Sequence, residues 1–121
     1  MAIKRILVVD DSATERHIIG EILSKQGYEV TFAEDGESGV TKAKQSKPDL
    51  VVMDVVMPGM NGFQATREIT KDPETQHIPV LICTTKDQET DKVWGLRQGA
   101  KDYVVKPVDA AELLSKIAAL G

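Results

Sequence analysis

The chain has 121 residues, 41% of them hydrophobic, and a formal net charge of −4, which suits one domain that can bury its own core. The acidic balance and the lack of a basic run argue against a nucleic-acid-binding surface. No apolar run approaches the roughly 20 residues that span a bilayer, and Met1–Arg5 leads straight into an apolar segment rather than a signal peptide, so we expect a single cytoplasmic domain over residues 1–121.

Five short apolar segments alternate along the chain with five segments of helical character. This alternation is typical of a doubly wound α/β fold, in which helices cover both faces of a parallel sheet. The second apolar segment alternates polar and apolar residues, which favours an edge position in the sheet. The predicted strands are Arg5–Val9, Glu29–Ala33, Leu50–Asp54, Val80–Thr84 and Asp102–Val105.

Two of the predicted helices carry signals that bear on the site and on partners. The first begins at a capping box, Ser12-Ala13-Thr14-Glu15, whose serine and glutamate are expected to satisfy free backbone amides. The fourth has an apolar stripe of Val93, Leu96 and Ala100, which we expect to face the sheet. Trp94 lies one position off this stripe, so its ring is either an exposed anchor for a partner or folded over a neighbouring helix.

Three aspartates follow two of the predicted strands. Asp10 and Asp11 end the apolar run Ile6–Val9, and Asp54 ends the run Leu50–Met53. In parallel sheets, ligands bind outside the carboxyl ends of the strands, so we expect the three carboxylates to converge. Their mutual repulsion favours a hard divalent cation, and oxygen ligands alone indicate Mg²⁺. Capping of the following helices would explain one such aspartate but not three at matching strand ends.

Four motifs in this order resemble the receiver domain of two-component response regulators. They are Val9-Asp10-Asp11-Ser12, the segment Met53–Gly62, Thr84 at the end of the fourth predicted strand, and Val105-Lys106-Pro107. The resemblance covers the whole chain and implies the flavodoxin-like, CheY-like (βα)5 sandwich, with a five-stranded parallel sheet in the order 2-1-3-4-5.

Two longer segments, Gly62–Arg67 and Thr84–Gly95, are similar to the stand-alone receivers of the chemotaxis-like systems that control type IV pili and twitching motility. The family resemblance implies a phosphoacceptor signalling protein with intrinsic self-phosphorylation and self-dephosphorylation chemistry, and not a dedicated enzyme. No segment is left over for an output domain, so the expected output is a change in protein binding.

The resemblance also implies roles for the residues of the acidic pocket. Asp54 would take a phosphoryl group from a phosphohistidine on a histidine kinase of the CheA type. Asp10 and Asp11 would hold Mg²⁺, with the Asp54 carboxylate and the backbone carbonyl of Val56 completing the protein ligands. Phosphoryl transfer mainly requires a positioned nucleophile and neutralisation of charge on the equatorial oxygens, which this residue set can supply.

Three further residues belong to the implied switch. Lys106, joined to Pro107 by a cis peptide bond, would place its ammonium beside Asp54 and later beside the phosphoryl group. Thr84 would donate a hydrogen bond to the phosphoryl group, and Tyr103 would turn inward when the threonine is drawn away. These movements would change the surface of the fourth helix, the fifth strand and the fifth helix, where an output protein is expected to bind.

Three questions stay open at this level. The chain is either a switch with its own output partner or a phosphate sink that drains a shared kinase, and it is expected to be a monomer or a weak, phosphorylation-dependent dimer. The resemblance places Val56 and Lys86 at positions that help govern water access to an acyl phosphate, so altered self-hydrolysis is expected without a stated direction. A flavin-binding protein on the same fold is disfavoured, because the loop Asp11-Ser12-Ala13-Thr14 begins with an acid, which suits a cation better than a phosphate.

Overall fold

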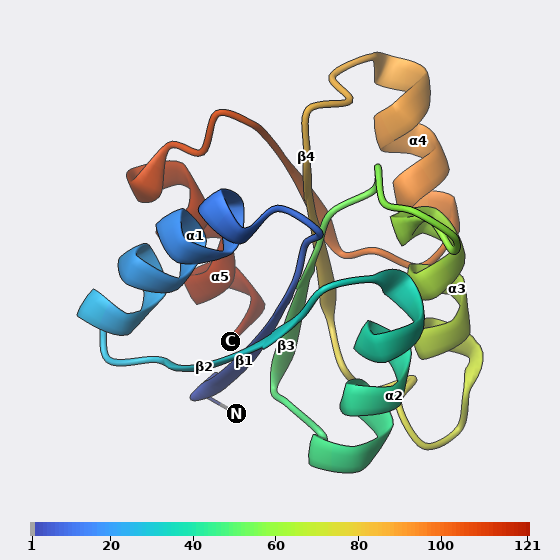
Figure 1. The fold of residues 1–121 in the computed structure, drawn as a ribbon, viewed down its shortest axis with the longest axis horizontal. Coiled ribbons are helices and arrows are strands. Elements are labelled where there is room, and N and C mark those ends of the chain that lie inside the picture. The colour runs from blue at the N-terminus through green and yellow to red at the C-terminus, as the bar shows by residue number, and fades with distance from the viewer. Residues whose placement is uncertain (1) are drawn as a thin grey trace.

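The computed structural model describes residues 2–121, which form a five-stranded parallel sheet in the order β2-β1-β3-β4-β5 (Figure 1). The predicted doubly wound α/β fold and its strand order are confirmed. The third strand ends one residue earlier than predicted, so Asp54 lies in the loop that follows it. The strands are β1 Arg5–Val9, β2 Glu29–Ala33, β3 Leu50–Met53, β4 Val80–Thr84 and β5 Asp102–Val105.

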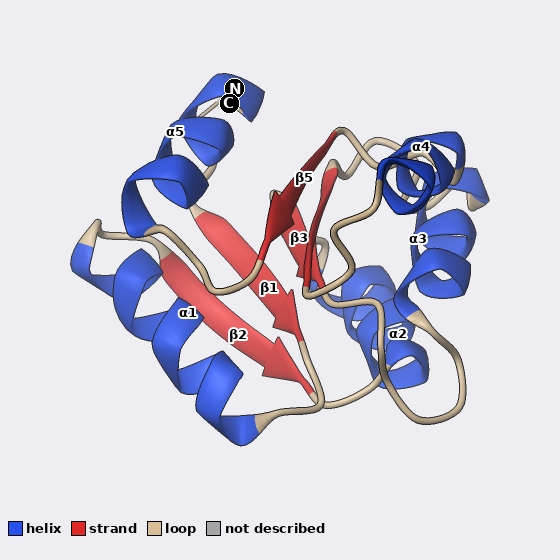
Figure 2. Ribbon diagram, turned by 90° about the horizontal axis from the view of Figure 1, so that it is seen from above, coloured by secondary structure: helices blue, strands red, loops and turns tan. Residues whose placement is uncertain are grey.

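Helices cover both faces of the sheet, with α1 and α5 on one face and α2, α3 and α4 on the other (Figure 2). Successive residues of a strand point to opposite faces, so Leu7 and Val9 pack toward α2 and α3 while Ile6 and Val8 pack toward α1 and α5. No helix of residues 2–121 is long and apolar enough to cross a membrane. The helices are α1 Ala13–Lys25, α2 Gly36–Ser46, α3 Gly62–Lys71, α4 Glu89–Arg97 and α5 Ala110–Leu120.

The start of α1 departs from the predicted capping box. The Ser12 hydroxyl accepts a hydrogen bond from the amide of Glu15 at 3.2 Å, as predicted. Among the hydrogen bonds of the described residues, however, the Glu15 carboxylate makes no return bond to Ser12. It lies instead near Lys106, at 4.0 Å, because a buried ammonium attracts a carboxylate more strongly than a backbone amide at a solvated helix end does.

The predicted burial of the apolar stripe is wrong for Val93 and Leu96, whereas Ala100 is buried but lies beyond the end of α4. Val93 is 45% exposed and Leu96 is 50% exposed, and Trp94 beside them is also 50% exposed. Gly95 is the buried residue of α4, and a Cβ added there would lie 2.8 Å from Ile82 Cδ1. The missing side chain lets the helix backbone approach the sheet, and this approach turns the larger apolar side chains outward.

Candidate functional site

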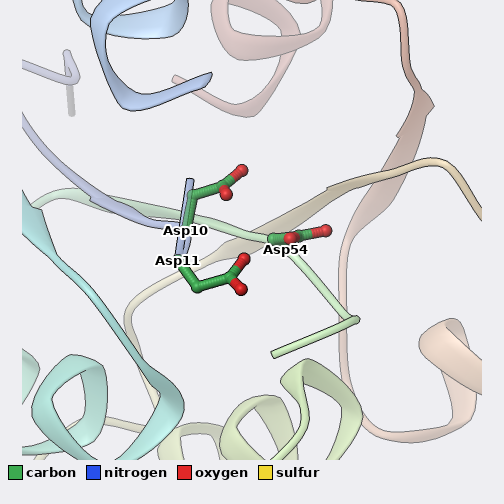
Figure 3. Close-up of side chains that lie close together, drawn as sticks. All are labelled: Asp10, Asp11 and Asp54. Atoms are coloured by element: carbon green, nitrogen blue, oxygen red, sulfur yellow. The ribbon is translucent and has the colours of Figure 1, made fainter. Parts of the chain in front are cut away.

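The three predicted aspartates meet at one edge of the sheet (Figure 3). β1 and β3 are adjacent, with Val9 opposite Met53, so the residues that follow each strand emerge side by side. Each aspartate offers a carboxylate oxygen, and these oxygens all lie within 4.8 Å of one another. Asp10 and Asp54 are buried, whereas Asp11 is exposed. Solvent therefore reaches the cluster at Asp11, whereas Asp10 and Asp54 are shielded from it.

The structure also brings Lys106 into this cluster from the loop after β5. Its side chain is 7% exposed, and its Nζ donates a hydrogen bond to Asp10 Oδ2 at 2.6 Å. The same nitrogen lies 3.7 Å from Asp54 Oδ1. The peptide bond between Lys106 and Pro107 is cis, as the family resemblance implied. A buried ammonium therefore neutralises part of the negative charge of a buried carboxylate pair.

Burial and charge act in opposite directions on the two central groups. Burial raises the pKa of Asp54 above the ordinary value of 3.8, assisted by the charge of Asp10 and opposed mainly by Lys106. Burial alone would lower the pKa of Lys106, but its hydrogen bond to Asp10 and the charge of Asp54 raise that pKa overall. Lys106 thus stays protonated at neutral pH, which leaves Asp54 an acceptor beside a fixed positive charge.

Thr84 is the last residue of β4, and Tyr103 lies on the neighbouring strand β5, opposite Ile82. Thr84 is fully buried, and its hydroxyl oxygen accepts a hydrogen bond from the Lys86 amide at 3.5 Å. The Tyr103 ring lies inward, 6% exposed, and its hydroxyl donates to the backbone carbonyl of Lys86 at 2.8 Å. Burial raises the pKa of Tyr103 to about 12, so this hydroxyl remains a donor at neutral pH. The loop after β4 therefore contacts both residues of the predicted switch.

Two residues that hold the cluster in place were not predicted to do so. A Cβ at Gly62 would lie 1.8 Å from the carbonyl oxygen of Asp54, and the Gly62 amide donates to the Val55 carbonyl at 2.9 Å. Arg16 donates from Nη1 to the Asp10 carbonyl at 2.7 Å. Gly62 ends the motif Met53–Gly62 that the sequence analysis identified. The reason that this position must lack a side chain is its close approach to the backbone of Asp54, which the motif does not indicate.

The residues present fit a hard divalent cation. The donors are carboxylate oxygens, two of them from side chains that the fold buries, and Mg²⁺ prefers a few such oxygens together with water. The side chain of Val56 is 56% exposed in the loop after Asp54, so it leaves the mouth of the cluster open to solvent. The role of its backbone carbonyl as a ligand stays a prediction.

Comparison with known proteins identifies the class to which this site belongs. A family model described as the response regulator receiver domain matches residues 6–118, and the chain belongs to that family. The chain is 62% identical over 116 residues to Protein PilH of Pseudomonas aeruginosa (strain PAO1), which covers 96% of each protein. It is 40% identical over 116 residues to Response regulator PleD of Caulobacter vibrioides, covering 96% of this chain and 26% of PleD.

Solved structures of related receiver domains have the same fold, and one of them contains a magnesium ion. The chain matches the chemotaxis protein CheY4 of Vibrio cholerae with a TM-score of 0.91 and 32% identity, covering 99% of this chain and 100% of that one. It matches the receiver domain of the sensor histidine kinase PA1611 of Pseudomonas aeruginosa with a TM-score of 0.89 and 31% identity, covering 98% of each. That structure has a magnesium ion coordinated in its active-site cleft.

Proposed function

We propose that Asp54 accepts a phosphoryl group from a phosphohistidine on a histidine kinase of the CheA type. The observation that carries this proposal is the buried Asp54 carboxylate, 3.7 Å from the Lys106 ammonium and within the acidic cluster. A carboxylate beside a fixed positive charge and next to a cation site has what phosphoryl transfer asks of a protein, namely a positioned nucleophile and charge neutralisation.

In the transfer, an oxygen of the Asp54 carboxylate forms a bond to phosphorus while the bond from phosphorus to the histidine nitrogen breaks. The electron pair of that bond returns to the imidazole, and the product is an acyl phosphate on Asp54. Lys106 changes partners from the Asp10 and Asp54 carboxylates to a phosphoryl oxygen. Mg²⁺, held by Asp10, Asp11, the Asp54 carboxylate and the Val56 carbonyl, would supply neutralisation of charge on the phosphoryl oxygens.

The switch acts through Thr84 and Tyr103. The phosphoryl group adds about −1.5 to −2 charges beside the Thr84 hydroxyl, which donates to one of its oxygens. The loop after β4 then moves with Thr84, and the bond from Tyr103 to the Lys86 carbonyl couples this loop to β5. The surface formed by α4, β5 and α5 changes in consequence, and an output protein binds there.

The similarity to PilH supports a role in type IV pilus twitching motility. We infer that residues 1–121 work as a single cytoplasmic receiver domain, a monomer or weak phosphorylation-dependent dimer, whose output is protein binding rather than direct contact with nucleic acid or membrane. A phosphate sink for a shared kinase would use the same Asp54 chemistry and would need no output partner.

The test is intact-mass measurement after incubation with Mg²⁺ and acetyl phosphate. The wild-type chain should gain one phosphoryl group, Asp54→Ala should gain none, and Asp87→Asn, which alters an exposed acid after β4, should behave as wild type. Loss of the adduct within seconds, without any partner that binds the phosphorylated form, would favour the sink. A wild-type chain that binds Mg²⁺ but takes up no phosphoryl group would refute the proposal.

A further inference from the structure

A fourth carboxylate, that of Glu15, reaches the functional site from the first turn of α1. Its Oε2 lies 4.0 Å from Lys106 Nζ, and its side chain is 29% exposed. The backbone of Glu15 is held by its amide, which donates a hydrogen bond to the Ser12 hydroxyl. The helix cap thus determines where Glu15 lies, and its carboxylate is free to face the lysine.

Glu15 differs from the aspartates in what it contacts. The cluster of carboxylates that could share a cation consists, among the described residues, of Asp10, Asp11 and Asp54. A cation held in that cluster would neutralise charge on Asp10 and Asp54, the two acids nearest to Lys106. Within residues 2–121, Lys106 pairs with Asp10, Asp54 and Glu15. The Glu15 carboxylate is the one of the three that the cation would not bind, so it would stay available to Lys106.

We propose that Glu15 is a positioning residue that draws the Lys106 ammonium toward α1 and thereby slows phosphorylation of Asp54. This inference rests on the proposed function of Asp54. Lys106 Nζ lies 2.6 Å from Asp10, 3.7 Å from Asp54 and 4.0 Å from Glu15, so a small shift of the ammonium decides which carboxylate it favours. While Glu15 attracts the ammonium, less positive charge faces the incoming phosphoryl group.

The first experiment measures initial rates of phosphorylation by acetyl phosphate at saturating Mg²⁺, using intact mass. Glu15→Gln should react about threefold to tenfold faster than wild type at low salt, and the gain should shrink as salt screens the charge. Glu15→Asp keeps the charge but shortens the reach to Lys106, so its rate should lie nearer to that of Glu15→Gln. The matched control is Glu21→Gln on the same helix, whose carboxylate pairs with Lys25 at 3.9 Å and which should react as wild type.

The second experiment measures Mg²⁺ affinity of the unphosphorylated chain by calorimetry. Without Glu15, Lys106 turns fully onto the Asp10 oxygen that the ion needs, so Glu15→Gln should weaken Mg²⁺ binding by about twofold to fivefold. In a Lys106→Gln background, the same change should have almost no effect. A loss of equal size in that background would show that Glu15 acts directly through its charge and would overturn the positioning role.

The two proposals fail in different ways. A wild-type chain that takes up no phosphoryl group overturns the proposed function of Asp54. A wild-type chain that is phosphorylated, with Glu15→Gln reacting at the same rate, overturns the role of Glu15 alone. Equal acceleration by Glu21→Gln also overturns it, because the effect would then come from the net charge of the chain and not from the contact with Lys106.

Discussion

Gly62→Ala should be among the most disruptive small substitutions in this chain. The added Cβ would lie 1.8 Å from the Asp54 carbonyl oxygen, 1.2 Å short of the 3.0 Å that real Cβ atoms almost never undercut. The neighbour is backbone, so no flexible side chain can move aside, and either α3 or the end of β3 must shift. Overpacking of a well-packed site lowers the free energy of unfolding by about 1–3 kcal/mol and sometimes more. Because the obstacle here is backbone, we expect Gly62→Ala to lower it by about 3 kcal/mol or more.

Gly59→Ala is the matched control, because Gly59 lies in the loop that leads into Gly62 and its backbone, not its surroundings, favours glycine. A Cβ there meets nothing within 4 Å, but the residue has a φ of +72°. The left-handed backbone alone should cost about 1 kcal/mol. Urea unfolding followed by far-ultraviolet circular dichroism gives both free energies of unfolding by linear extrapolation. The expected difference between the two variants is about 2 kcal/mol or more.

The functional consequence is separable from the stability loss. A shift of the backbone at Asp54 moves the proposed nucleophile relative to Lys106, so the folded fraction of Gly62→Ala should take up phosphoryl groups much more slowly than Gly59→Ala. If the two variants unfold within about 1 kcal/mol of each other, the close approach of Gly62 to Asp54 does not exist in solution and the reasoning is refuted.

Three further outcomes follow from the charges and hydrogen bonds of the site. Burial raises the pKa of Asp54, so its ionisation destabilises the folded chain as pH rises from 3.8 through the folded pKa. Asp54→Asn should therefore raise the free energy of unfolding by about 1–2 kcal/mol at pH 7 without Mg²⁺, and a gain that persisted below pH 3.8 in denaturant titrations would contradict this cause. Lys106→Gln removes the ammonium from two buried carboxylates and should lower the free energy of unfolding by about 3–5 kcal/mol in metal-free buffer. Saturating Mg²⁺ should restore most of this loss in thermal unfolding, and no recovery would argue against a cation site there. Tyr103→Phe removes the donor to the Lys86 carbonyl and should cost about 0.5–1.5 kcal/mol, whereas unchanged urea unfolding would mean that this bond is not made in solution.

The sequence predicted the sheet and its central residues well, because the physics behind them is local. Apolar runs such as Ile6–Val9 suit the middle of a parallel sheet, and acids directly after such runs must emerge at its carboxyl edge. Asp10 and Asp54 therefore followed from pattern and topology together. The predicted position of Lys106 beside them came from family resemblance, since no local pattern indicates that a loop at the far end of the sheet reaches back to β1.

The two errors in the helices have a common cause, which is that a local pattern was outweighed by a contact made with another part of the fold. The capping-box pattern places the Glu15 carboxylate at the helix end, but the charge of Lys106 lies close enough to attract it. The stripe of Val93 and Leu96 predicts a buried face, but Gly95 allows a closer approach of α4 to the sheet on another face. Lys106 lies far from Glu15 in the sequence, and the residue that Gly95 approaches is Ile82 of β4, so neither contact can be read from the residues of one helical turn.

The unusual packing of α4 supports the proposed switch. The helix rests on the sheet through a glycine, and its C-terminal end is tied to α3 by the Thr70 hydroxyl, which donates to the Gln98 carbonyl at 2.7 Å. Half-exposed apolar side chains such as Trp94 contribute little to holding it in place. A segment with few buried apolar contacts moves at low free-energy cost. In the proposed switch, the charge added at Asp54 would therefore need to supply only a modest free energy to displace the end of α4 nearest Thr84.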